Sequence, residues 1–442
     1  MTELTVAVRD LVAFCHRSGD IDHRFTPSPT SQQGIEGHQR VYRQRPDSYL
    51  REYAVDYRHR QADIELLLRG RADGYDPAAG LVEEIKTCRV PAQRIPESVS
   101  RQHLAQGRLY AAMIAGQEDL EALEVRLTWF NIDSGEEHLL SQRYTRAELA
   151  DFLQQTLRRF SDWLRVLAAR RRARDASLES LAFPYDDFRP GQRDIAELVY
   201  KCTDQGGQLL LEAPTGIGKT AAVMYPALKA LGRGKHDGVI FVTARNVGRR
   251  AAEDCLDLLR GRGLELSALS LTAKERICFS PGKACHGDDC PYASGYYDRL
   301  PQALRAAAAA PTLDRPAIEA VAREFTVCPY QLAQDLLPWV SLVIADQHYV
   351  YSLAAAPGGP AGDGRWSVLL DEAHNLPERA RDMYTARLAK ADLMAARRGA
   401  GGTVKRALDR VNRALLVLAA EQWQEADQDC REVLPERLQG AL

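Results

Sequence analysis

The chain has 442 residues, enough for about three domains, and its 45% hydrophobic and 27% charged content is that of a globular protein. No apolar run approaches the roughly 18 residues of a membrane span, and no basic stretch precedes an apolar core at the N-terminus, so we expect a cytoplasmic protein without membrane contact. The formal net charge of −2 neither proposes nor excludes nucleic acid as a partner.

Residues 1–175 have the mixed pattern of an α/β domain. Helical periodicity is visible over 6–15, 34–43, 98–114 and 146–173, and strand patterns over 49–57, 62–75, 81–88 and 124–132. The strands 62–75 and 81–88 are joined by Asp-Pro-Ala-Ala-Gly, which predicts a hairpin.

The hairpin carries ionisable residues that could form a catalytic site. Glu84 and Lys86 are two positions apart on one strand, so their side chains leave the same face, and Asp73 on the preceding strand can come beside them. Two carboxylates and an ammonium on one face make a site for a divalent cation, with the lysine left to polarise a scissile phosphate. The alternative is a salt-bridged, solvent-facing sheet surface.

Neighbouring residues complete a known pattern: a helical His, then Asp, Glu-x-Lys and Gln-x-x-x-Tyr. With that order, residues 30–135 resemble the PD-(D/E)XK nucleases of the RecB type. The resemblance implies Mg²⁺ or Mn²⁺ ligands at His38, Asp73 and Glu84, a catalytic Lys86, and DNA contacts from Gln106 and Tyr110.

Residues 176–185 form the expected linker, with Pro184 next to its end, and a phosphate-binding loop follows further along the chain. The apolar run Leu209–Leu211 predicts a buried parallel strand, and the next small residues open a helix, as a phosphate cradle requires. Ala213 stands where the general pattern has Gly, and an ordinary strand-turn-helix is the alternative reading. The expected ATP contacts are Pro214, Thr215, Gly216, Gly218, Lys219 at the terminal phosphates and Thr220 at the magnesium ion.

An acidic partner for this loop follows another apolar strand, residues 366–370. Asp371 at the strand end can hold Mg²⁺ through water, and Glu372 can orient and deprotonate the attacking water, so Glu372 and Lys219 are the expected catalytic residues of ATP hydrolysis. Taken alone, the tetrapeptide Asp-Glu-Ala-His would also fit a helix cap.

Four of the nine cysteines lie within about fifty residues between the two ATPase motifs: Cys278, Cys285, Cys290 and Cys328. Four thiolates can hold zinc or an iron–sulfur cluster. Tight Cys-x-x-Cys pairs, usual in zinc sites, are missing, and the irregular spacing favours a cluster. The other five cysteines are scattered and read as buried thiols.

The stretch from 183 to about 380 is similar to the iron–sulfur helicases related to XPD and DinG, of superfamily 2. The resemblance implies a RecA-like motor lobe over 186–270 and 335–380, a [4Fe-4S] insertion over 271–334, and a helical arch beginning within 381–442. It further implies that Gln192 reads adenine, that Thr243 and Arg245 grip the nucleic-acid backbone, and that ATP drives unwinding from single-stranded or junction DNA.

No second RecA-like lobe is recognisable before Leu442, so we expect half of an ATP site, with weak, DNA-insensitive hydrolysis unless a second lobe is supplied in cis or in trans. The leading hypothesis is a metal-dependent DNA nuclease coupled to an ATP-dependent helicase. One alternative is a non-cleaving DNA-binding module. Another keeps the helicase and makes the N-terminal domain a structural adaptor.

Overall fold

The computed structural model describes residues 2–24, 28–61, 64–214, 216–244, 246–310, 312–352, 364–422 and 432–441. Two compact units are present: residues 1–350 with 355–373, and residues 351–354 with 374–442. Among the described residues no helix has the length and apolar character needed to cross a bilayer.

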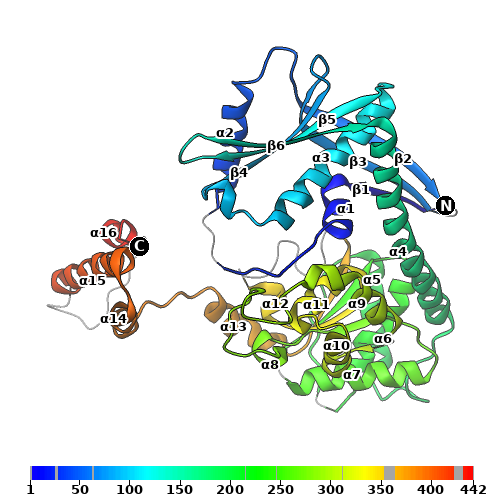
Figure 1. The fold of residues 1–442 in the computed structure, drawn as a ribbon. Helices are drawn as coiled ribbons and strands as arrows, with labels where there is room; N and C mark the ends of the chain where they lie inside the picture. Colours follow the sequence, from blue (N-terminus) through cyan, green and yellow to red (C-terminus); the bar gives the residue numbers. More distant parts are fainter. Residues whose placement is uncertain are drawn as a thin grey trace. The chain divides into compact units, whose positions relative to one another are not determined.

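The N-terminal domain is a six-stranded mixed sheet with helices packed on it (Figure 1). Strands β1, β3, β4, β5 and β6 are neighbours in that order, and β2 pairs with β3. The elements are β1 (Thr2–Ala7), α1 (Val8–Cys15), α2 (Ser31–Tyr42), β2 (Leu50–Gln61), β3 (Ile64–Asp76), β4 (Leu81–Cys88), α3 (Glu97–Gln117), β5 (Ala122–Asn131), β6 (Glu137–Thr145) and α4 (Arg146–Ser180). The expected helices and strands are present, while β1 and β6 were not expected.

Burial explains these assignments. Strand β3 begins with five consecutive buried residues and β4 likewise, because both are covered by helices, whereas β6 is largely exposed and gives little apolar signal in the sequence. Helices α2 and α4 begin with reciprocal capping boxes, Thr30 with Gln33 and Thr145 with Glu148.

The second domain of this unit contains a five-stranded sheet in the order β11, β7, β10, β8, β9, with every pair parallel. This confirms the expected α/β parallel sheet. Its elements, with the connecting helices, are α5 (Gln192–Gln205), α6 (Lys219–Gly232), β7 (Gly238–Thr243), α7 (Asn246–Gly261), β8 (Ala268–Ser270), α8 (Lys274–Ile277), α9 (Tyr296–Ala309), β9 (Thr312–Leu313), α10 (Arg315–Glu324), α11 (Pro329–Leu336), β10 (Leu342–Asp346), α12 (His348–Tyr351) and β11 (Trp366–Leu370). Strand β9 lies inside the segment expected to be the insertion, yet it extends the sheet.

The strand expected before the phosphate loop is not formed. Residues 206–214 have no strand or helix, and Leu210 is 92% exposed. Leu211 and Ala213 instead pack against Ile195 and Val199 of α5. Within the described parts of the chain no strand joins the sheet on that side, so β11 is its edge, and Val368 on β11 is left exposed.

The expected linker 176–185 is also corrected. Helix α4 continues to Ser180, and Leu178, Leu181 and Phe183 are buried with the residues of α6 and β7. Lys229 of α6 donates to the carbonyl oxygens of Leu178 (2.7 Å), Glu179 (2.9 Å) and Leu181 (3.3 Å), so a cation caps the helix C-terminus. This stretch is therefore packed core.

Aromatic packing joins the two domains further. Trp339 lies edge-on to Phe14 of α1 (ring centroids 5.5 Å apart) and to Trp163 of α4 (5.6 Å). Two arginines of α4 also contact the second domain: Arg174 donates to Ser341 Oγ (2.8 Å) and Arg170 to the Ala310 carbonyl (3.1 Å).

The second unit is helical, with α13 (Leu376–Met383), α14 (Lys390–Gly399), α15 (Gly402–Gln422) and α16 (Glu436–Gln439). Helices α14 and α15 pack together, with Leu393, Val411 and Ala414 buried and an Arg397–Asp409 ion pair. The helical content agrees with the expectation for residues 381–442.

Candidate functional site

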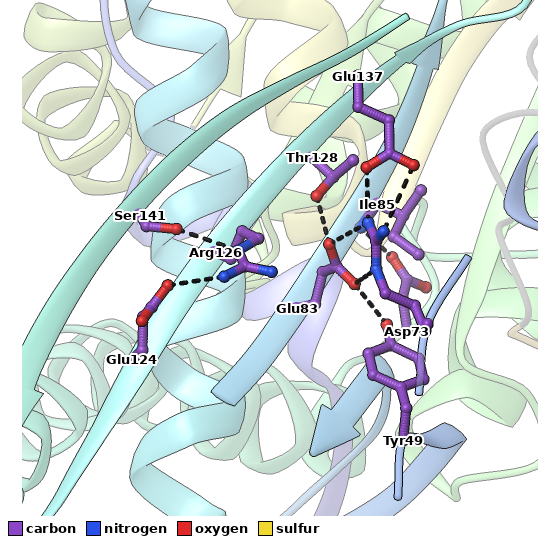
Figure 2. Close-up of polar contacts among 10 residues, drawn as sticks. Tyr49, Asp73, Glu83, Ile85, Glu124, Arg126, Thr128, Glu137 and Ser141 are labelled. Carbon is purple, nitrogen blue, oxygen red and sulfur yellow. Dashed lines mark hydrogen bonds and ion pairs between the residues drawn. The ribbon is translucent and has the colours of Figure 1, made fainter. Parts of the chain in front are cut away.

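A group of ionisable side chains gathers where the ladder between β3 and β4 stops. The last ladder pair in that direction is Gly74 with Glu83. Asp73, the next residue of β3, accepts a hydrogen bond from the backbone N–H of Ile85 through Oδ2 (2.7 Å; Figure 2). A carboxylate thereby replaces the ladder bond, and its position is fixed by the backbone of β4.

Glu84 and Lys86 leave the same face of β4, as the period of a strand predicts. Lys86 Nζ donates to Glu84 Oε1 and to the Ile85 carbonyl (3.3 Å), and it lies 3.9 Å from Asp73 Oδ2. The sequence therefore correctly places Asp73, Glu84 and Lys86 together. The alternative of a solvent-facing surface is wrong for Glu84, which is only 1% exposed.

Burial dominates the electrostatics of this group. It raises the pKa of Glu84 to about 8, with repulsion from Asp73 adding to the effect and Lys86 opposing it. Burial also raises the pKa of Asp73, against Lys86 and His38. For Lys86 burial lowers the pKa, but Glu84 and Asp73 together raise it above its ordinary value. A bound cation would stabilise the charged forms of these two neighbouring carboxylates.

His38 reaches the group from helix α2. The helix lies close to β4, because a Cβ at Gly37 would come within 2.5 Å of Thr87 Cγ2, and only glycine permits that approach. His38 Nδ1 consequently lies 3.9 Å from Asp73 Oδ1. Glu52 of β2, which sequence reasoning missed, completes a group with His38 and Asp73 whose ligand atoms all lie within 4.8 Å of one another. These residues could hold a divalent cation.

Gln106 and Tyr110, the two residues expected to contact DNA, both belong to helix α3. Tyr110 of α3 is 4% exposed and belongs to the domain core, and it is hydrogen-bonded to Gln106. Burial raises the pKa of the Tyr110 phenol, and the charge of Glu84 adds to this. Their contact with DNA stays a prediction.

A second buried carboxylate, Glu83, points to the other face of β4 (Figure 2). It accepts two hydrogen bonds from Arg45 (Nε 2.8 Å, Nη2 2.7 Å), one from Tyr49 Oη (2.7 Å) and one from Thr128 Oγ1. Arg45 also pairs with Glu137 (2.8 Å). Burial raises the pKa of Glu83, but these donors together hold it below its usual range. The network ties the end of α2, and thus the helix of His38, to β4 and β5.

The phosphate loop and Gln192 form a second site. Gln192 is 1% exposed; its Oε1 accepts from Arg189 N (3.0 Å) and its Nε2 donates to the Gly218 carbonyl (3.2 Å), while Arg189 Nη1 donates to the Gly216 carbonyl. Gly218 has φ +82°, and a Cβ there would come within 2.5 Å of Gln192, so glycine is required. The expected adenine-reading residue thus lies against the loop.

Lys219 begins helix α6 and donates to the Ala213 carbonyl (3.1 Å). Asp371, which follows β11, has its N–H bonded to the Val242 carbonyl (2.8 Å). Burial and Glu372 raise the pKa of Asp371, and the charge of Lys219 lowers it, so the lysine and the carboxylate face one site. Glu372 has φ +53°, a left-handed conformation uncommon outside glycine.

The remaining expected contacts of this site are placed as follows. Pro214 and Gly216 are exposed, Thr220 is half-buried in the first turn of α6, and Thr243 is 3% exposed at the end of β7, next to the strand that leads to Asp371. Thr215 and Arg245 lie outside the described residues. The roles of all these residues remain predictions.

The four clustered cysteines line one cavity of about 30 Å³. Cys278 ends helix α8 and Cys328 precedes the first turn of α11, which brings the distant fourth cysteine to the other three.

The N-terminal domain contributes to this cavity, which sequence reasoning missed. Ile21 and His23 line it, and their N–H groups bond to the carbonyls of Ala293 (2.9 Å) and Cys285 (2.9 Å). Asp20 accepts from the backbone N–H of Gly295 (2.6 Å). No periodicity in residues 19–24 signals this contact, because it is made mainly through the backbone.

Comparisons with known proteins agree with the nucleotide site. Residues 189–277 match the DEAD/DEAH box helicase family and residues 264–393 match DEAD_2. These matches show that residues 189–393 of the chain are similar to DEAD/DEAH-box helicases. They cover neither the N-terminal domain nor the end of the chain.

Individual relatives are distant. The "Regulator of telomere elongation helicase 1 homolog" of Drosophila melanogaster is 21% identical over 267 residues, and that of Drosophila yakuba 20% over 266, each covering 48% of this chain and 27% of the relative. The chain thus spans about a quarter of the length of these curated relatives. Among solved structures, "XPD_Helicase" aligns with a TM-score of 0.38 at 15% identity (58% of this chain, 45% of that one), and "Truncated XPD" with 0.35 at 15% (55% and 71%). Likeness at these scores adds nothing to the family match.

Proposed function

We propose that this chain is part of an ATP-dependent DNA helicase that also carries a metal-dependent DNA nuclease. The observation that carries the helicase half is the convergence of Gln192, Lys219 and Asp371 on the phosphate loop within the DEAD/DEAH-box region. Lys219 would neutralise the terminal phosphates of ATP, and Thr220 with Asp371 would hold Mg²⁺. Glu372 would take the proton of the attacking water, and a second lobe, in cis or in trans, would complete the site.

The nuclease half rests on the group at the end of the β3–β4 ladder. A bound Mg²⁺ or Mn²⁺ would stabilise charge developing on the scissile phosphate. In the chain itself, Asp73 and Glu84 supply acidic oxygens, His38 a ring nitrogen, and Lys86 an ammonium 3.9 Å from Asp73 Oδ2 that can approach the phosphate or position water. Gln106 and Tyr110 would hold the strand, as would Thr243 and Arg245 in the motor.

For the cysteine cavity we propose a [4Fe-4S] cluster, bound by Cys278, Cys285, Cys290 and Cys328. Its support is that all four line one cavity, and that the sequence lacks the tight Cys-x-x-Cys pairs usual in zinc sites. Loaded protein should be brown with broad absorbance near the visible blue, lost in Cys285→Ser and kept in Cys202→Ser, whose thiol lies outside the cavity. Colourless protein containing zinc would refute the cluster.

The nuclease assignment is tested with end-labelled single-stranded DNA in the presence of Mg²⁺ or Mn²⁺. We expect cleavage by the wild type, its loss in Lys86→Ala, and its retention in Lys201→Ala, which removes an exposed lysine of α5. If Lys86→Ala and the wild type digest equally, the nuclease is wrong. DNA retained without cleavage would indicate the non-cleaving binding module instead.

Nucleotide binding is tested separately with a fluorescent ATP analogue and Mg²⁺. Lys219→Ala should lose binding while Lys201→Ala keeps it. We expect weak hydrolysis that single-stranded DNA does not stimulate, because the described residues form only one parallel sheet beside the phosphate loop, and ATP hydrolysis in such motors occurs between two lobes. Strong stimulation by DNA would show that the chain completes its own site.

A further inference from the structure

Glu52 stands directly across the sheet from Asp73. The β2–β3 register pairs Arg51 with Gly74 and Tyr53 with Ala72, and it skips the Glu52–Asp73 pair between them. Glu52 has φ +49°, a left-handed conformation that interrupts an otherwise continuous strand. The one break in this ladder between residues 50 and 57 therefore coincides with two carboxylates facing each other.

The two oxygens of Asp73 face different neighbours. Oδ2 accepts from Ile85 N (2.7 Å) and faces Lys86 Nζ (3.9 Å), whereas Oδ1 faces His38 Nδ1 (3.9 Å). Glu52 joins Asp73 and His38 within the 4.8 Å group, and its exposed side chain opens that group to solvent. The lysine side of Asp73 is thus separate from the side where Glu52 and His38 meet.

An unpartnered buried oxygen lies beside the same group. Glu84 is 1% exposed, its Oε1 accepts from Lys86 Nζ, and its Oε2 is buried without a hydrogen-bond partner among the residues that the structure describes. Lys86 Nζ, which donates to Glu84, also lies 3.9 Å from Asp73 Oδ2, so the carboxylates of Glu84 and Asp73 are neighbours. A buried carboxylate oxygen without a donor is costly, and the positive charge of a cation bound at the neighbouring group would offset part of that cost.

We propose that Glu52 is a metal ligand, which with His38 and Asp73 Oδ1 forms a divalent-cation site on the solvent side of the carboxylate group. Tyr42 Oη donates to Glu52 Oε1 (3.2 Å) and leaves the other carboxylate oxygen for the cation. Oxygen ligands with one imidazole suit Mn²⁺ or Mg²⁺. The inference rests on the proposed nuclease for its purpose, but it concerns cation binding alone.

The test is calorimetric titration of the full chain with Mn²⁺ alone, without DNA or ATP. Binding that persists in Asp73→Asn is taken as background. Once this background is subtracted, we expect Glu52→Gln to weaken Mn²⁺ binding about 10-fold or more. The control Glu136→Gln, which alters an exposed carboxylate in the β5–β6 turn, should leave Mn²⁺ binding unchanged.

Glu52→Gly separates ligation from folding. Glycine adopts φ +49° without strain, so the variant should melt at the same temperature as the wild type or higher, and still lose Mn²⁺ affinity. A purely structural Glu52 would give the reverse, a lower melting temperature with Mn²⁺ affinity kept.

The outcomes distinguish this inference from the nuclease. Equal Mn²⁺ affinity in Glu52→Gln and the wild type, with metal-dependent cleavage intact, overturns the Glu52 ligand and keeps the nuclease. Affinity that depends on Glu52 in a protein that cleaves no DNA supports the cation site and overturns the nuclease.

Discussion

Replacing Glu83 by Gln should loosen the N-terminal sheet strongly. The carboxylate is fully buried and accepts four hydrogen bonds, two of them from Arg45. Glutamine puts an NH₂ donor where one oxygen accepts, so at least one buried donor loses its acceptor. Breaking a buried ion pair costs about 3–5 kcal/mol. Because Glu137 still pairs with Arg45, we expect about 2–3 kcal/mol.

The assay is hydrogen–deuterium exchange of the full chain, followed on peptides from β4 and β5. Exchange through local opening should be roughly 30- to 100-fold faster in Glu83→Gln, at about 1.4 kcal/mol per tenfold. The matched control is Glu124→Gln on the same sheet (Figure 2), whose partner Arg126 lies 3.0 Å away with both side chains partly exposed. That pair should contribute at most about 1 kcal/mol.

The pH dependence has a defined sign. The pKa of Glu83 is below its usual range in the folded protein. The stability that Glu83 contributes is therefore complete above the pKa that it has in the unfolded chain, and it is lost as pH falls through the pKa that it has in the folded protein. The difference between the wild type and Glu83→Gln should therefore shrink in acid. Exchange in Glu83→Gln no faster than in Glu124→Gln at neutral pH would refute the network.

Three further predictions concern other contacts. Lys229→Met should loosen the last turn of α4 by about 1–2 kcal/mol, measured by exchange over residues 176–183, because three carbonyls lose their cation; unchanged protection would contradict the cap. His16, hydrogen-bonded to Thr156 Oγ1 (2.8 Å), has a pKa lowered to about 4 by burial and by nearby arginines. The stability contributed by the neutral imidazole is therefore complete above about pH 6.5 and is lost as pH falls toward 4. Thermal melting should accordingly show a smaller loss between pH 7 and 4.5 in His16→Gln than in the wild type, and equal losses would count against it. Asp20→Ala removes the acceptor of the Gly295 N–H and should speed exchange over residues 17–24, whereas identical uptake would mean that this contact does not hold the segment.

Local patterns predicted much of the N-terminal domain. Alternation and the turn signal gave the β3–β4 hairpin, and the two-residue period placed Glu84 with Lys86. Glu52 could not be predicted, because its position depends on the pairing of β2 with β3 and on a left-handed residue that no sequence pattern marks. Glu83 was missed because its donors come from distant segments of the chain.

Two predictions failed for physical reasons. The apolar run Leu209–Leu211 reads as a strand, but its segment packs against helix α5 without joining the sheet. The stretch 176–185 reads as a linker because of the proline near its end, yet Leu178, Leu181 and Phe183 are buried and Lys229 donates to three of its carbonyls. In both cases tertiary packing decided the outcome over local preference.

The central claim is that one chain holds an independent nuclease site and a nucleotide site. Cleavage of labelled single-stranded DNA with Mn²⁺ should be compared in the wild type, Lys86→Ala and Lys219→Ala. We predict that Lys219→Ala cuts as well as the wild type without ATP, while Lys86→Ala does not cut. Equal cutting by all three proteins, or none by the wild type, would contradict the claim.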